Sequence, residues 1–226
     1  MTEAADRRLD SFAAVLWDMD GTLVDTEPYW MDAEAALAER YGGTWSREHA
    51  LELVGSDLLD SGRYIREHMG IDVSAEAIVE ELLDSVIERV EHAVPWRPGA
   101  RELLASLRDA GVRCGLVTMS YARFVEPIIE ALPEGSFAVV VTGDAVDLGK
   151  PHPEAYITAA RRLDVLASDC LAIEDSDTGA TSAASAGCTV LCAPLHVSVP
   201  PGPGRVFVES LEGLTAGARL ALGDEP

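Results

Sequence analysis

The chain has 226 residues, of which 48% are hydrophobic and 6% are aromatic. This length can bury a sizeable core, either as one large domain or as a core that carries an insertion. The formal net charge of −22 argues against binding to nucleic acid or to an anionic membrane, since both are negatively charged.

No segment has the composition of a targeting or membrane-spanning sequence. The first ten residues, MTEAADRRLD, lack the apolar stretch of a signal peptide, and no apolar run approaches the length that spans a membrane. Four cysteines without a CxxC spacing lie in or beside apolar runs, which is typical of buried free thiols in a reducing compartment: Cys114, Cys170, Cys188 and Cys192. We therefore expect a cytoplasmic protein, and since nothing indicates an obligate interface, a monomer.

The first predicted strand is the apolar run at 12–17, and two carboxylates follow it, Asp18 and Asp20 in the segment LWDMDGTLVDTEP. Side chains two apart in an extended segment share a face, so both carboxylates can point into one cavity. Gly21 then allows the backbone to turn away sharply. Such a pair can bind a hard cation, or act as a nucleophile and a proton-transfer group. The alternative is an acidic turn or a helix N-cap, which would explain an isolated Asp-Gly pair.

Residues 25–95 show helical periodicity and no strand pattern. The predicted helices span 27–41, 47–54, 58–69 and 74–92. We therefore predict two domains, a core made of residues 1–24 and 96–226, and an all-helical insertion made of residues 25–95. The insertion carries 17 acidic and five basic residues, which we assign mainly to solvated helix faces.

After residue 95, short apolar runs alternate with helical stretches. Pro98 and Gly99 open one predicted helix. The later pattern predicts strands at 112–117, 137–141, 170–173 and 189–192, with helices at 121–132, 154–163 and 178–186 between them. A short edge strand at 205–208 and a final helix at 211–220 complete the prediction. Strands that alternate with helices indicate an α/β fold, a parallel sheet with helices on both faces.

The only lysine of the chain is Lys150, in the loop DLGKPHP between a predicted strand and a predicted helix. Arginine serves as the cation elsewhere, so a position that keeps lysine indicates a site that needs a compact charge on a thin stem. The negative net charge makes such a local cation necessary for any phosphate-bearing ligand. Retention in an exposed surface turn is the alternative.

Two further strand ends carry polar groups. Thr118 ends the strand at 112–117, where its hydroxyl and the free amides of the next turn would form an anion-binding end or an ordinary helix N-cap. Glu174 and Asp175 end the strand at 170–173, where they would bind a metal ion or cap the next helix. Parallel sheets bind ligands beyond the carboxyl ends of their strands, so we expect all these groups to converge there.

Together these motifs resemble those of the haloacid dehalogenase-like (HAD) superfamily phosphatases. The resemblance covers nearly the whole chain in four ordered motifs, which are DMDGTLVDTEP, the threonine of LVTMS, the lysine of GKPHPE, and EDSDTG. The sequence is similar to the branch with a helical cap after the first motif, the group of beta-phosphoglucomutase and phosphoglycolate phosphatase. The resemblance implies a Rossmann-like parallel-sheet core with an inserted all-helical cap domain, a small-molecule phosphomonoester substrate, and Mg²⁺ as cofactor.

The resemblance also implies how the core motifs would act. Asp18 would attack phosphorus and form an aspartyl-phosphate. Asp20 would protonate the leaving oxygen and then take a proton from the hydrolytic water. Thr118, Lys150 and the Met119 amide would hold the phosphate oxygens, and Lys150 would lessen the repulsion between the nucleophile and the incoming dianion.

The same resemblance implies a metal site and a closing cap. Mg²⁺ would be held by Asp18, the Asp20 carbonyl and Asp175, with Glu174 binding the ion directly or through its waters. The cap would close over the site and select the substrate. The candidates for substrate specificity in the cap are Glu27, Trp30 and Gly55. An aromatic residue on such a helix is more often part of the core, and we favour that interpretation for the tryptophan.

The predicted function is phosphomonoester hydrolysis, and a beta-phosphoglucomutase-like sugar phosphomutase is the alternative. Mutases of this group resemble phosphatases at the core but typically hold a second phosphate with a cap arginine in a GxSRxxS-like loop. The corresponding stretch here reads VGSDLLD, the cap has no lysine, and Arg63 and Arg66 lie outside the expected position. Dehalogenases of the superfamily lack the second aspartate of the first motif in its acid/base role. Asp20 is present here, which favours phosphoryl transfer. A non-catalytic binding protein is disfavoured because no motif residue is missing.

Overall fold

The computed structural model describes residues 6–221, and its centre is a six-stranded parallel sheet with the order β4-β3-β2-β5-β6-β7. The strands are β2 (Ala14–Trp17), β3 (Arg113–Val117), β4 (Val139–Val141), β5 (Cys170–Glu174), β6 (Thr189–Cys192) and β7 (Arg205–Phe207). β2 lies between β3 and β5, so the first predicted strand is central. The predicted α/β fold and its short edge strand are confirmed.

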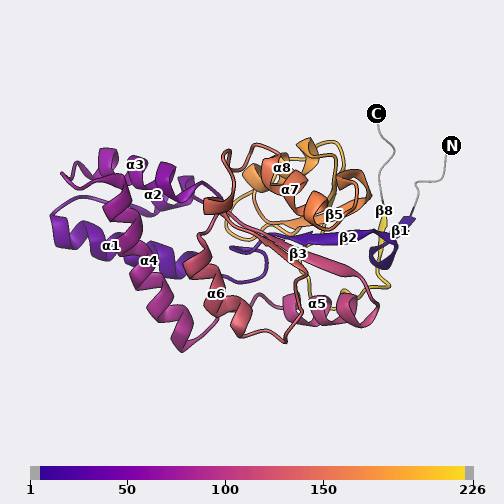
Figure 1. Cartoon of the computed structure of the whole chain (residues 1–226). Helices are drawn as coiled ribbons and strands as arrows, with labels where there is room; N and C mark the ends of the chain where they lie inside the picture. Colours follow the sequence, from indigo (N-terminus) through magenta and orange to yellow (C-terminus); the bar gives the residue numbers. More distant parts are fainter. Residues whose placement is uncertain (1–5, 222–226) are drawn as a thin grey trace.

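Helices cover both faces of this sheet (Figure 1). They are α5 (Ala100–Asp109) and α6 (Ala122–Glu130) on one face, and α7 (Glu154–Arg162) and α8 (Asp177–Ser185) on the other. Side chains alternate along β2, so that Val15 and Trp17 join one buried cluster and Ala14 and Leu16 join the other. Because the strand is buried on both faces, its sequence is a continuous apolar run and not an alternation of apolar and polar residues.

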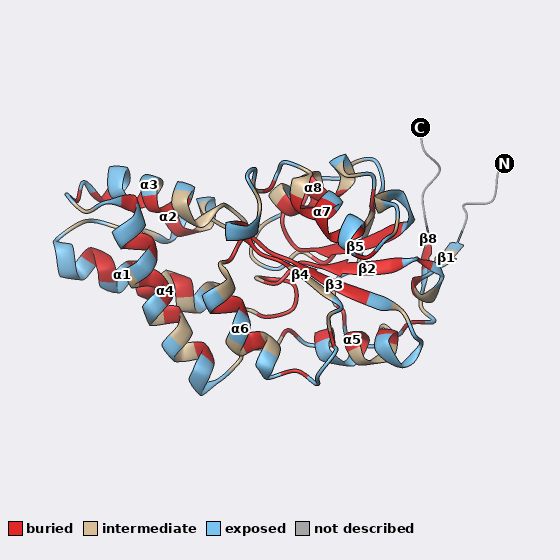
Figure 2. Cartoon of the chain, in the orientation of Figure 1, coloured by how far each residue is buried: buried red, intermediate tan, exposed pale blue. Residues whose placement is uncertain are grey.

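Four helices between β2 and α5 form the cap: α1 (Glu27–Tyr41), α2 (Arg47–Glu52), α3 (Leu58–Met69) and α4 (Ala75–His92). The cap lies beyond the carboxyl ends of the strands, and the described chain ends lie at the opposite end of the sheet (Figure 1). The Asp57 side chain begins α3 by accepting hydrogen bonds from the amides of Leu59 and Asp60. Figure 2 shows buried residues both along the strands and on the cap helices, so the cap contributes to the core.

The predicted helix at 211–220 is wrong. The segment consists of turns followed by β8 (Arg219–Ala221), which pairs antiparallel with β1 (Asp6–Arg8). Gly213 adopts a φ of 75°, which is incompatible with a right-handed helix. The carbonyls of Ala216 and Ala218 accept hydrogen bonds from the start of the chain, at Asp10 and Leu9. Contacts distant in sequence therefore override the local apolar spacing, and they also explain why β1 escaped prediction.

The remaining differences are small. The second cap helix ends at Glu52 rather than at residue 54, because the chain turns through Gly55 with a φ of 76°. All four cysteines are buried free thiols, as predicted. Between residues 6 and 221, no helix is both long enough and apolar enough to cross a membrane.

Candidate active site

The turn after β2 places two carboxylates at the edge of the sheet that faces the cap. Gly21 in this turn has a φ of 83°, and a Cβ atom on it would lie 2.0 Å from Oδ2 of Asp175. The position therefore requires glycine for its conformation and for space. Arg97 supports the turn, since its buried guanidinium donates to the Gly21 carbonyl at 2.6 Å. Sequence reasoning missed this arginine, which lies 76 residues away along the chain.

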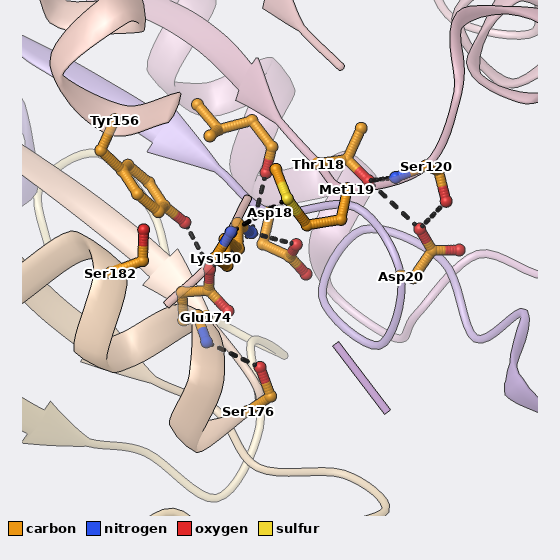
Figure 3. A network of polar contacts seen from close by, with 12 residues as sticks. Asp18, Asp20, Thr118, Met119, Ser120, Lys150, Tyr156, Glu174, Ser176 and Ser182 are labelled. Carbon is orange, nitrogen blue, oxygen red and sulfur yellow. Dashed lines mark hydrogen bonds and ion pairs between the residues drawn. The ribbon is translucent and has the colours of Figure 1, made fainter. Parts of the chain in front are cut away.

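Lys150 lies at the centre of the site, with its side chain only 2% exposed. Its Nζ donates to Asp18 Oδ1 at 2.7 Å, to Glu174 Oε1 at 2.8 Å and to the Val117 carbonyl at 3.0 Å (Figure 3). Burial alone would lower the pKa of this ammonium, but the adjacent carboxylates outweigh burial and raise it. The lysine therefore stays charged, and the four strand-end motifs meet as expected.

Glu174 connects this lysine to a residue that sequence reasoning missed. The hydroxyl of Tyr156, on α7, donates to Glu174 Oε1, the same oxygen that accepts from Lys150 (Figure 3). Burial raises the Glu174 pKa to about 7, and Lys150 opposes this shift. A Cβ atom on Gly179 would lie 2.0 Å from the other oxygen, so a helix residue without a side chain makes room for the carboxylate. The available signal was a tyrosine among alanines, because a buried tyrosine hydroxyl needs a partner.

Three carboxylates form a cluster that could hold a metal ion. Asp18, Glu174 and Asp175 each offer one oxygen atom, and these atoms lie within 4.8 Å of one another. Each residue also has a buried oxygen without a hydrogen-bond partner among residues 6–221. Burial, followed by repulsion from Asp18 and Glu174, raises the pKa of Asp175 well above its usual value. A hard cation prefers oxygen ligands of this kind and would offset the excess negative charge.

Asp20 faces hydroxyl groups rather than the lysine. Its Oδ1 accepts from the Thr26 hydroxyl at 2.5 Å, and its Oδ2 accepts from Ser120 at 2.7 Å and from Thr118 at 3.3 Å. Burial raises the pKa of Asp20, the hydrogen bond from Thr26 opposes the shift, and the charge of Asp18 adds to it. A carboxyl with a raised pKa keeps its proton to higher pH and can donate it. Sequence reasoning missed Thr26 and Ser120 as partners of this carboxyl.

The turn after β3 brings Thr118 and Met119 to the same place. The Thr118 hydroxyl accepts from the Ser120 amide at 3.0 Å and donates to Asp20 (Figure 3). Met119 lies beside the lysine loop, where its Sδ accepts from the Lys150 amide at 3.1 Å. Both residues line the cavity between cap and core.

All three specificity candidates also line this cavity. Trp30 is buried, as favoured, and packs edge-to-face on Phe124 of α6 with ring centroids 5.4 Å apart. It therefore serves both as an interdomain core residue and as part of the cavity wall. A Cβ atom on Gly55 would lie 2.9 Å from Oγ of Ser176, so the cap loop touches the core here. Glu27 is the first residue of α1, and burial together with repulsion from Asp20 raises its pKa to about 8.

Comparison with known proteins agrees with the fold. The family of haloacid dehalogenase-like hydrolases matches residues 12–187, and the chain belongs to this family. A solved structure of CbbY from Rhodobacter sphaeroides in complex with phosphate superposes with a TM-score of 0.80. It is 27% identical in sequence, and the match covers 89% of this chain and 96% of that chain.

Curated relatives define the class of enzyme. Hexitol phosphatase B of Escherichia coli O157:H7 is 32% identical over 210 residues, which is 90% of this chain and 94% of the relative. Phosphorylated carbohydrates phosphatase of Thermotoga maritima is 31% identical over 184 residues, which is 77% of this chain and 81% of the relative. The chain is accordingly an enzyme, a HAD-like phosphatase.

Proposed function

We propose that the enzyme is a Mg²⁺-dependent phosphomonoester hydrolase that acts on a small phosphorylated metabolite through an aspartyl-phosphate on Asp18. The observation that carries this proposal is the state of the Asp18 carboxylate. Lys150 holds Oδ1, Oδ2 is buried without a hydrogen-bond partner in the described chain, and Asp18 lines the cavity. An oxygen in this position is oriented and free to form a bond.

In the proposed first step, Asp18 Oδ2 forms a bond to phosphorus while the bond from phosphorus to the leaving oxygen breaks. Asp20 delivers its proton to that oxygen, which its raised pKa favours. Water then attacks phosphorus, the bond from phosphorus to Asp18 breaks, and Asp20 takes the proton of the water. Lys150, the Thr118 hydroxyl and the Met119 amide would hold the remaining phosphate oxygens during both steps.

The residues present fit the proposed Mg²⁺. Asp18, the Asp20 carbonyl and Asp175 would hold the ion, and the buried Oδ2 of Asp175, which has no hydrogen-bond partner in the described chain, supports this assignment. When bound, the ion supplies positive charge against the phosphate oxygens. Glu174 uses Oε1 for Lys150 and Tyr156, so only Oε2 is left for the metal or for its waters.

We also propose the domain boundaries predicted from the sequence. Val24 and Trp96, which flank the proposed insertion, form a β-bridge. Beside them, the Asp25 amide donates to the Pro95 carbonyl at 2.7 Å. Two linkers held side by side would allow residues 25–95 to move as one unit about the core.

Hydrolysis is better supported than the phosphomutase reaction. A mutase must hold a second phosphate in the cap while the sugar reorients. Among the described residues that line the cavity, the only cation is Lys150, and it belongs to the phosphate end. The names of the relatives, hexitol phosphatase and phosphorylated carbohydrates phosphatase, support a sugar or polyol phosphate as the substrate.

A phosphate-release screen over a panel of metabolite phosphomonoesters with Mg²⁺ tests the proposal, with Asp18→Asn as the blank. We expect release by the wild type, loss of release in the variant, and no accumulation of an isomeric phosphate. Release that persists unchanged in Asp18→Asn contradicts the assignment of the nucleophile. Isomer formation without phosphate release would favour the mutase.

A further inference from the structure

The cap side of the cavity carries two carboxyl groups on one face of α1, of which Glu34 is buried and Glu27 is half-buried. Glu27 and Glu34 are seven residues apart, which is close to two helical turns, and both line the cavity. Glu34 is only 5% exposed, and its Oε2 accepts a hydrogen bond from Nε1 of Trp45 at 2.9 Å. Burial raises its pKa to about 7. Both acids belong to the cap wall of the cavity, whose core wall carries the residues proposed to hold the phosphate.

No positive group balances these acids within the described chain. Lys150 is the only cation among the described lining residues, and it is already bound to Asp18 and Glu174. The rest of the cap wall is apolar, apart from two serines, Ser56 and Ser61. A second observation points to a ligand in this space: Asp18, whose Oδ2 is buried and without a partner in the described chain, lines the same cavity.

We propose that this cap pocket accepts a leaving group that is uncharged and bears hydroxyls, and excludes one that bears a carboxylate or a second phosphate. The inference rests on the proposed hydrolysis of phosphomonoesters and specifies its substrate class. Hydroxyl groups donate to carboxylate oxygens and accept from a protonated carboxyl, so the two glutamates suit a polyol in either state. The apolar wall contacts the carbon chain between the hydroxyls.

The same pocket would be unfavourable for an anionic substituent on the leaving group. Such a substituent would lose its hydration on entering the pocket and find no cation there, and a buried unpaired charge is strongly unfavourable. Like charges placed close together in a shielded site add to this penalty.

A matched pair of ligands tests the proposal without needing turnover. Glucitol 6-phosphate and 6-phosphogluconate differ only at C1, which is a hydroxymethyl group in the first and a carboxylate in the second. Binding of each to Asp18→Asn with Mg²⁺ is measured by calorimetry at pH 8. We expect glucitol 6-phosphate to bind roughly 30-fold more tightly or better, the range of a like-charge juxtaposition.

Glutamine substitutions in the same background then test whether the two acids cause this preference. Glu34→Gln keeps an oxygen that can accept from Trp45, so the cap is expected to fold. It should reduce the preference about tenfold, and Glu27→Gln should do the same. Glu39→Gln is the matched control, because Glu39 is exposed on the same helix and does not line the cavity. It should leave the preference unchanged.

Equal binding of the two ligands, tighter binding of 6-phosphogluconate, or no binding of glucitol 6-phosphate overturns the inference. A preference that survives both glutamine substitutions also overturns it. Failure of the proposed function has a different signature, which is the absence of Asp18-dependent phosphate release by the wild type from p-nitrophenyl phosphate. The two failures can therefore be told apart.

Discussion

Tyr156→Phe removes a single hydroxyl from the buried chain of contacts that runs from Tyr156 through Glu174 to Lys150. That hydroxyl and the lysine ammonium donate to the same carboxylate oxygen, the lysine at 2.8 Å. Phenylalanine keeps the ring, whose centroid lies 5.2 Å from Lys150 Nζ. The packing and the contact between cation and ring therefore remain, and the substitution isolates the hydroxyl.

The expected loss follows from the burial of this hydrogen bond. A hydrogen bond to a charged group contributes about 1.5–3 kcal/mol, and both Tyr156 and Glu174 are fully buried. We expect the free energy of unfolding to fall by about 2 kcal/mol. We also expect kcat to fall about tenfold with a smaller change in KM, because Glu174 loses the hydroxyl that fixes it and therefore positions Lys150 against Asp18 less firmly.

Urea unfolding measures the stability, and phosphate release from p-nitrophenyl phosphate measures kcat and KM. Tyr41→Phe is the matched control, because its hydroxyl also donates to a glutamate, Glu81, at 3.0 Å, but on the exposed surface. We expect this control to change the stability by less than about 0.5 kcal/mol. Equal losses of stability in the two variants, or a wild-type kcat in Tyr156→Phe, would refute the reasoning.

Three other predictions concern the metal, the cap and pH. Mg²⁺ at 100 times its dissociation constant should stabilise the wild type by about 2.7 kcal/mol in urea unfolding. Asp175→Asn should remove most of this stabilisation. An unchanged stabilisation in the variant would contradict the assignment of Asp175 as a metal ligand. Arg123 of α6 pairs with Glu80 and Asp84 of α4 at an exposed position. Arg123→Ala should therefore raise KM by less than about fivefold at low salt. A difference in KM between variant and wild type that persists at high salt would exclude this ion pair as its cause. The pKa of Glu34 is raised to about 7, so the folded state holds a proton that the unfolded state has lost. The free energy of unfolding should fall between about pH 4.5 and pH 7, by roughly 2–3 kcal/mol. Urea unfolding at pH 5 and pH 8 should show this fall in the wild type and a smaller one in Glu34→Gln; equal falls would contradict the assignment.

The sequence allowed the strand-end groups of the site to be predicted because a parallel sheet gathers them by its topology. Asp18, Thr118 and Glu174 each follow a recognisable apolar run, and adjacent parallel strands end at the same edge. Lys150 was recognised by being the only lysine. None of these inferences required knowledge of side-chain contacts.

The residues that support this site could not be predicted in the same way. Tyr156 lies on a helix face whose other buried members are small or apolar, so it reads as a core residue. From the sequence alone, Arg97 would be assigned to a linker, and its role is seen only in the hydrogen bond that it donates to the Gly21 carbonyl. Their roles depend on contacts between segments that the sequence pattern does not pair, and the pairing of β1 with β8 escaped prediction for the same reason.

The electrostatics of the molecule connect the metal with the substrate. Three carboxylates, Asp18, Glu174 and Asp175, lie close together, the first two pair with the single ammonium of Lys150, and burial raises the pKa of the latter two. The folded chain alone therefore holds this charge at a penalty, which a divalent cation would relieve. The cap side of the cavity has two further acidic groups, Glu27 and Glu34, but no cation among its described lining residues. One end of the cavity is thus suited to a phosphate that arrives with a cation, and the other end to a group that carries no charge.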